Sequence, residues 1–464
     1  MVIRYFCRIP AYTRSLIFSL LDVRLPHNIL QRRPVVTTMP SNEGSGSSSN
    51  AAAPKNVLVI GGSYSGLAAA LNLLDLCQGK NCRFAGNSMS DAEGVREKIP
   101  VQITIVDERD GYFHLIGTPL AFASEEYATS AWRKFSDIPA LQTPAVKCIQ
   151  GSVTFVDCER KVSIIREAGT NKEITQTYDY LIASSGLRRT WPSAPQSLRK
   201  DEYLIEAGKH IAKTKIAEDG IVVVGGGAVG VEIAAELKAE QPDRNVTLIH
   251  SRSKLLSSEP LPDGFRDKAL ELLHDAGVET ILSSRVTNTT STYPKEGNAS
   301  PSYTLTLADG RTLKAGYVIN AISKYSPTTS YLPSSALDKE GYVKINNTLN
   351  FPSDMPNAQY HFAAGDVALW SGIKRGGRAM HHGHYVAMNI HQRMLSERFG
   401  TAPKFSELQD LPPSMGLAVG KKAVSYSDFD GVTSGEETAR LYFGDDLGFS
   451  ICWNYLRLGE AASS

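Results

Sequence analysis

Two glycine turns of the chain have the residue types and the spacing that suit binding of a diphosphate. In such a turn the first glycine lets the chain reverse, the second lets the backbone approach a pyrophosphate, and the third packs a helix against a strand. The second turn of this chain has all three, as Gly225, Gly227 and Gly230. A helix that begins there directs its positive N-terminus at the phosphates. We therefore predict dinucleotide binding, with a tight turn that holds no ligand as the alternative.

The first turn departs from this pattern at one position. It contains Gly61, Gly62, Ser63 and Gly66, so that a serine stands where the second glycine is expected. Serine is small, and it restricts the approach of a phosphate without preventing it. Asp107 ends the next apolar run, where a carboxylate accepts hydrogen bonds from ribose hydroxyls. An insertion makes the interval before Asp107 longer than usual, which lowers the specificity of this motif taken alone.

The corresponding position in the second unit carries no acid. The residues there are His250, Ser251 and Arg252. A carboxylate at this place favours the 2′-hydroxyl of NADH, whereas an arginine can meet the 2′-phosphate of NADPH. We therefore predict that NAD(P)H binds here, with Arg252 as a binding residue. A solvated loop charge is the alternative for Arg252.

Apolar runs and helix formers surround both turns in the order strand, turn, helix, strand. The runs at 57–60 and 221–224 precede the turns, and the runs at 101–106 and 246–249 follow the helices. These are two βαβ units of the kind found in parallel sheets. Short alternating pieces between residues 153 and 182 indicate a small antiparallel meander.

Length and composition set outer limits on the function. A chain of 464 residues predicts about three structural units. The net charge of +1 shows no basic excess, so we expect no nucleic-acid partner. The cysteines form no C-x-x-C motif and no metal-type pairing with histidine, which predicts a reduced intracellular protein without a metal site. The six cysteines are Cys7, Cys77, Cys82, Cys148, Cys158 and Cys452.

The first 40 residues differ from the rest in charge. They contain six arginines, and Asp22 is their single acidic residue. This composition predicts a mitochondrial transit peptide, and a start of translation at Met39 is the alternative. A Gly/Ser tract at 41–53 is typical of a linker. We expect a mitochondrial protein if the leader is real, and otherwise a cytoplasmic one, free or membrane-associated. Since every apolar run is shorter than about 20 residues, we predict no transmembrane helix.

Five motifs in a fixed order resemble the pyridine nucleotide-disulfide oxidoreductase superfamily of flavoproteins. Within it, the likeness is to the apoptosis-inducing-factor-like branch, which includes ferroptosis-suppressor-type quinone reductases. Ser184 and Ser323 depart from the common form, which has Thr and Gly there. The segments that carry the resemblance are 59–66, 180–186, 224–232, 321–323 with 327–328, and 362–366.

The resemblance implies an α/β fold with two Rossmann-like dinucleotide-binding domains, the second inserted in the first, and a small C-terminal α+β region. The first domain would bind FAD and the second NAD(P)H. The implied divisions are a disordered leader and linker at 1–53, the FAD-binding domain at 54–190 and 326–395, the NAD(P)H-binding domain at 191–325, and the C-terminal region at 396–464.

The resemblance also places site residues. Gly365 and Asp366 would close the FAD site, since a carboxylate at a strand end can accept hydrogen bonds from the ribityl hydroxyls. An ordinary Gly-Asp turn is the alternative. Lys374 would lie beside the isoalloxazine ring, where a cation stabilises the anionic reduced flavin. A surface basic cluster with Arg375 and Arg378 is the alternative for Lys374.

A dense histidine group follows in the same region. Adjacent positions of one helix point about 100 degrees apart, so His381, His382 and His384 do not converge on a metal as a set. The resemblance implies instead a flavin-side hydrogen bond for His382. It places Glu232 near the nicotinamide, and an acid favoured by the helix dipole is the alternative there.

These assignments predict an oxidoreductase that passes hydride from NAD(P)H through FAD to a small acceptor. By resemblance the acceptor is a quinone, such as membrane ubiquinone. The aromatic stretch at 443–458 would cover the flavin, meet a membrane surface, or close the core as an amphipathic layer. Two other functions stay open: a redox-sensing or cell-death flavoprotein that acts by binding, and a flavin monooxygenase. The sequence predicts no oligomeric state.

Overall fold

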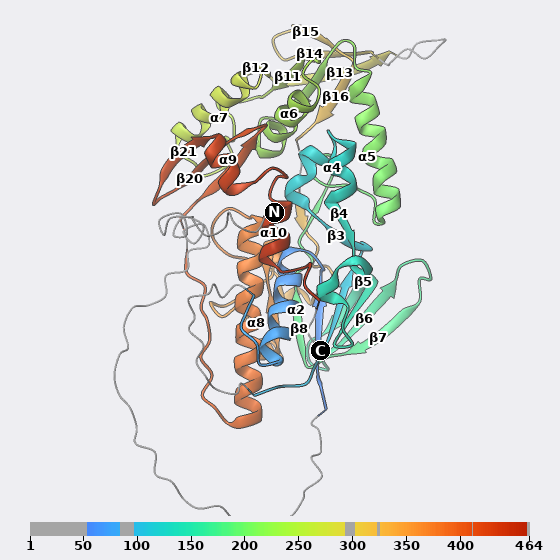
Figure 1. Ribbon diagram of the computed structural model, residues 1–464, viewed down its shortest axis with the longest axis vertical. Helices are drawn as coiled ribbons and strands as arrows, with labels where there is room; N and C mark the ends of the chain where they lie inside the picture. The colour runs from blue at the N-terminus through green and yellow to red at the C-terminus, as the bar shows by residue number, and fades with distance from the viewer. Residues whose placement is uncertain (1–52, 84–96, 293–301, 323–324, 411, 462–464) are drawn as a thin grey trace, which may run out of the picture.

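The computed structural model describes residues 53–83, 97–292, 302–322, 325–410 and 412–461, which form two α/β units and a C-terminal region (Figure 1). The predicted leader, the alternative start at Met39 and the departure at Ser323 lie outside the described residues. Across these ranges, every helix is too short or too polar to cross a membrane.

The first unit is built on a seven-stranded sheet with the order β18-β8-β1-β2-β5-β6-β7. At its centre β1 (Lys55–Ile60) pairs in parallel with β2 (Val101–Asp107) and with β8 (Tyr180–Ala183). β18 (His361–Ala363) pairs in parallel with β8. Because β18 follows the whole second unit in sequence, the second unit is inserted in the first, which confirms the predicted fold class.

The predicted meander extends this same sheet. β5 (Val146–Asp157) pairs in parallel with β2 at its start and antiparallel with β6 (Val162–Glu167) along its second half. β7 (Glu173–Thr177) continues the antiparallel edge. The alternating burial along these strands explains why the sequence shows a period of two here.

Two helices cover one face of the first sheet. α2 (Tyr64–Cys77) follows the first glycine turn, and α8 (Gly376–Phe399) lies beside it, as Figure 1 shows in blue and orange. The helices approach closely because Gly383 of α8 has no side chain, and a Cβ there would overlap the carbonyl oxygen of Ser65. The small residues Ala68 and Ala69 complete this buried contact.

The second unit has a parallel sheet of its own, with the order β12-β11-β10-β16. The glycine turn lies between β10 (Ile221–Val224) and α6 (Ala228–Glu240), next to β11 (Val246–Ile249). The other elements of the unit are α5 (Lys200–Lys215), α7 (Asp263–Asp275), β12 (Glu279–Ile281), β13 (Val286–Thr292), β14 (Ser302–Leu307), β15 (Thr312–Ala315) and β16 (Tyr317–Asn320).

The chain passes between the units on two adjacent strands, β9 (Leu187–Arg189) and β17 (Tyr325–Pro327), which pair antiparallel. The segment between β2 and β5 forms a small hairpin with two short helices. This segment contacts α5, because the ring of Tyr203 in α5 stacks on the ring of Trp132. The elements of this segment are β3 (Gly111–Phe113), α3 (Thr118–Ala121), α4 (Glu125–Ala131) and β4 (Trp132–Lys134).

The C-terminal region joins both units. Leu417 and Val424 from its small sheet lie in the core of the second unit, whereas Leu456 and Leu458 lie in the core of the first. The stretch at 443–458 therefore closes the core, as the interpretation of this stretch as an amphipathic layer predicts. The elements are β19 (Met415–Val419), β20 (Lys422–Ser427), β21 (Gly431–Gly435), α9 (Glu436–Tyr442) and α10 (Phe449–Tyr455).

Candidate cofactor and active site

The first glycine turn has a backbone that only glycine adopts without strain. Gly61 has a φ of +108°, and an added Cβ at Gly66 would overlap the carbonyl oxygen of Gly61. Ser63 is extended and directly precedes α2. The hydroxyl of Ser184, one of the two departures from the common motif, donates to the carbonyl of Ile60 at 2.9 Å and so ties β8 to the turn.

Asp107 lies against this turn despite the insertion that precedes it. Its Oδ2 accepts a hydrogen bond from the amide of Gly62 at 2.7 Å, and its Oδ1 accepts one from the amide of Arg109 at 2.8 Å. Burial raises the pKa of Asp107, and the charge of Arg109 opposes that rise. Each carboxylate oxygen keeps a further lone pair, so Asp107 can still accept from a ribose hydroxyl.

The second turn repeats the geometry of the first. Gly225 has a φ of +121°, and a Cβ at Gly230 would overlap the carbonyl oxygen of Gly225. A Cβ at Gly227 would meet no atom within 4 Å, so the side on which a pyrophosphate approaches is open. Arg252 lies on the exposed loop after β11.

Gly365 and Asp366 follow β18 at the same edge of the sheet as the first glycine turn. Gly365 has a φ of +75°, and a Cβ there would lie 2.5 Å from the hydroxyl of Ser65 in the first turn of α2. Asp366 forms an ion pair of 3.1 Å with Arg189 of β9, and both side chains are 20% exposed. The sequence analysis missed Arg189, since the ion pair joins residues 177 positions apart.

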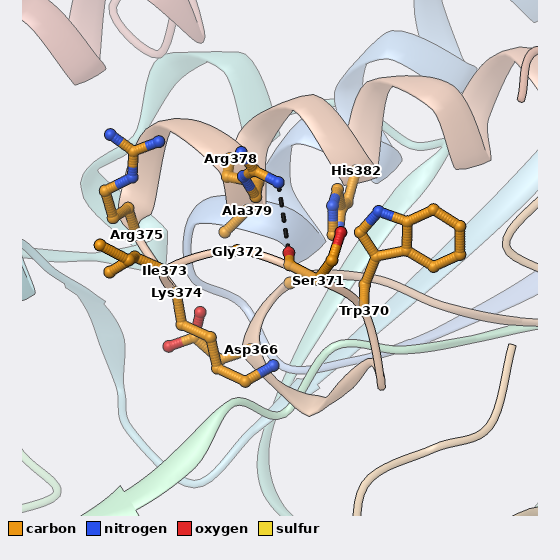
Figure 2. Close-up of a pocket in the computed structure, with 11 residues that line it drawn as sticks. Asp366, Trp370, Ser371, Gly372, Ile373, Lys374, Arg375, Arg378, Ala379 and His382 are labelled. Carbon is orange, nitrogen blue, oxygen red and sulfur yellow. Dashed lines mark hydrogen bonds between the residues drawn. The ribbon is translucent and has the colours of Figure 1, made fainter. Parts of the chain in front are cut away.

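Lys374 lines the same pocket as Asp366 (Figure 2). Its Nζ donates to the carbonyl of Ala368 at 2.9 Å and lies 4.6 Å from the centre of the Tyr342 ring. Burial lowers the pKa of Lys374, and the charge of Asp366 opposes that decrease. By contrast, Arg375 donates to the hydroxyl of Ser414 at 2.8 Å.

His382 faces the pocket that these residues line. Its side chain is 4% exposed, and its Nδ1 has no hydrogen-bond partner in the described chain. Burial lowers the pKa of His382 to about 3, so the ring is neutral. His381 lies instead against Tyr385, with ring centres 4.3 Å apart. No group of three or more metal-type ligands occurs among the residues described.

Two adjoining pockets share one wall. The first is lined by Asp366, Lys374 and His382 (Figure 2). The second has a more apolar lining. The residues common to both pockets are Trp370, Arg378 and His382. The further residues of the second pocket are His381, Tyr385, Leu408 and Gln409.

Glu232 lies outside this group, since it lines neither pocket. It is on α6, where burial raises its pKa to about 8 while a hydrogen bond from the backbone of Ala418 in β19 opposes that rise. One helical turn further along, Glu236 is also buried. The structure thus places Glu232 between the second unit and the C-terminal sheet.

The fold and the two turns define a two-nucleotide oxidoreductase. Residues 55–385 match the family model of the pyridine nucleotide-disulphide oxidoreductases, and the chain belongs to this family. This confirms the predicted superfamily.

Individual proteins extend the likeness over nearly the whole chain. Oxidoreductase OXR1 of Ajellomyces capsulatus is 71% identical over 98% of this chain and 99% of its own length. Ferroptosis suppressor protein 1 of Mus musculus is 27% identical over 87% of this chain and 96% of its own. Among solved structures, the sulfide:quinone oxidoreductase of Aquifex aeolicus has a TM-score of 0.59, with 18% identity over 88% of this chain and 93% of that chain. At this identity it shows the fold alone.

FAD and NAD(P)H are the cofactors of this family, as predicted, and the residues present fit them. The open side of Gly227, the free lone pairs of Asp107 and the unpartnered Nδ1 of His382 are polar or unobstructed positions that suit a nucleotide and a flavin. The role of each individual site residue is still a prediction.

Proposed function

We propose that this oxidoreductase passes electrons from NAD(P)H through FAD to a quinone. The observation that carries the proposal is the more apolar pocket beside the Asp366 pocket, with Trp370, Arg378 and His382 lining both. A planar ring with two carbonyl groups suits aromatic walls with a few polar groups. The resemblance to ferroptosis-suppressor-type quinone reductases supports the same acceptor.

The chain's own residues hold and tune the reactants. When bound, FAD supplies the hydride and two-electron chemistry. Asp366, kept in place by Arg189, is set to accept hydrogen bonds from cofactor hydroxyls. Lys374 supplies positive charge at the same pocket, which favours an anionic reduced cofactor. The neutral His382 can donate or accept one hydrogen bond through Nδ1 without adding charge.

Three alternatives to quinone reduction can be distinguished from it. A disulfide substrate would need a cysteine at the site, and no cysteine lines either pocket. Slow oxidation of NAD(P)H at a rate independent of the acceptor would favour the redox-sensing function. Tight coupling of NADPH loss to a hydroxylated product would establish a monooxygenase.

The test is anaerobic reduction of the purified holoprotein with NADH and NADPH, followed by re-oxidation with a short-chain ubiquinone, dichlorophenolindophenol, dioxygen or a disulfide. We expect the quinone to re-oxidise the flavin faster than dioxygen or the disulfide does. Replacing Leu408 with Phe narrows the second pocket and should raise the KM for quinone about tenfold, with flavin reduction unchanged. Leu395→Phe, on α8 away from the pocket, is the control. Equal re-oxidation by quinone and dioxygen would refute the proposal.

A further inference from the structure

In each glycine turn, the amide of the second residue donates a hydrogen bond to the side chain at the end of the next strand. The acceptor is a carboxylate in the first unit and an imidazole in the second. In the first unit the amide of Gly62 donates to Oδ2 of Asp107 at 2.7 Å. In the second unit the amide of Gly226 donates to Nδ1 of His250 at 3.0 Å. His250 therefore occupies the position that a ribose-binding carboxylate holds in the first unit.

The hydrogen bond also assigns the protonation of this histidine. Because Nδ1 accepts from Gly226, the proton of the neutral ring is on Nε2, which lies 3.3 Å from the hydroxyl of Ser257. Burial lowers the pKa of His250, a hydrogen bond with the backbone of Lys254 opposes that decrease, and the charge of Arg252 adds to it. The ring is thus an uncharged hydrogen-bond donor toward the loop.

The loop beyond His250 supplies further donors. Ser251, Arg252 and Ser253 are all exposed there. The neighbouring Lys254 is neutralised by Asp263 and Asp267, at 3.0 and 3.1 Å. Across the described ranges, no carboxylate forms an ion pair with Arg252, so its guanidinium charge is available to a ligand.

This combination discriminates between the two nicotinamide cofactors. A carboxylate at the His250 position would accept a hydrogen bond from the 2′-hydroxyl of NADH and would repel the 2′-phosphate of NADPH. A neutral imidazole removes the repulsion, and an unpaired guanidinium can form two charge-assisted hydrogen bonds with a phosphate. We propose that His250, Arg252 and the serines beside Arg252 form a 2′-phosphate subsite, so that the protein prefers NADPH to NADH. The proposal rests on NAD(P)H as the electron donor and is independent of the acceptor.

The first test measures binding without turnover. Calorimetry on the holoprotein compares adenosine 2′,5′-bisphosphate with adenosine 5′-monophosphate, which lacks the 2′-phosphate. We expect the bisphosphate to bind about 10- to 100-fold more tightly, the range for charge-assisted hydrogen bonds. Arg252→Gln, an exposed change that leaves the fold intact, should remove most of this difference. Arg440→Gln, exposed on α9, is the matched control and should leave it unchanged.

The second test measures the donor directly, as anaerobic flavin reduction by NADPH and by NADH. His250→Asp restores the carboxylate and should turn the preference toward NADH, because the new acid can still accept from Gly226. Equal affinities for the two adenosine nucleotides, or an unchanged ratio in Arg252→Gln, would overturn the proposal. If quinone fails to re-oxidise the flavin while the NADPH preference holds, the proposed acceptor is wrong and this subsite stands.

Discussion

Glu236 is a buried acid whose replacement should stabilise the protein at alkaline pH. Its side chain is 5% exposed, and its Oε1 has no hydrogen-bond partner among the residues described. Burial raises its pKa from 4.5 to about 7, and the nearby charge of Glu240 adds to that rise. The folded protein therefore holds a proton on Glu236 at pH values where the unfolded chain has already lost it.

The sign and size of the effect follow from this difference. The folded state binds the extra proton, so stability is greatest below about pH 4.5 and is lost as the pH rises to about 7. A pKa difference of about 2.5 corresponds to roughly 3 kcal/mol at pH 8. Glu236→Gln keeps the shape of the side chain and removes its charge, so it should recover up to that amount.

The assay is thermal unfolding of the holoprotein at pH 5.5 and pH 8.5, followed by intrinsic fluorescence. For a chain of this length, a gain of roughly 3 kcal/mol corresponds to an increase in Tm on the order of 3 °C. We expect that increase at pH 8.5 and a much smaller one at pH 5.5. Glu240→Gln, exposed four residues further along, is the control and should change Tm little at either pH. An equal shift at both pH values, or a loss of stability at pH 8.5, would show that the folded protein does not raise the pKa of Glu236.

Three further substitutions test the flavin site and the turns. Gly66→Ala should abolish flavin binding, because its Cβ would overlap the carbonyl oxygen of Gly61. The measurement is the flavin-to-protein absorbance ratio of the purified protein. Gly227→Ala is the control, and it should leave that ratio unchanged because a Cβ there meets free space. Asp366→Ala should give colourless or weakly flavinylated protein, since it removes a hydrogen-bond acceptor and leaves the half-buried Arg189 without its partner; full retention of flavin in that variant would remove the assignment of Asp366.

The glycine turns were predictable from the sequence because their geometry is local. A positive φ at Gly61 and Gly225 and the tight packing at Gly66 and Gly230 require glycine, so residue type alone marks the position. Apolar runs before and after each turn identify the parallel strands in the same way.

The arrangement around the turns depended on contacts between residues far apart in sequence. The ion pair of Arg189 with Asp366, the contact of Lys374 with Tyr342 and the inward position of His382 leave no periodic pattern in the sequence. At the position of His250, the sequence indicated only that an acid is missing. It did not indicate that the histidine accepts a hydrogen bond from the glycine turn.

The physical reason is that backbone conformation is set by a residue and its immediate neighbours, whereas side-chain pairing is set by which strands meet. The chain brings β18 beside β8 only after it has completed the whole inserted unit. The sequence by itself therefore determined the two nucleotide folds and their turns, and the tertiary structure alone decided which charges and rings surround them.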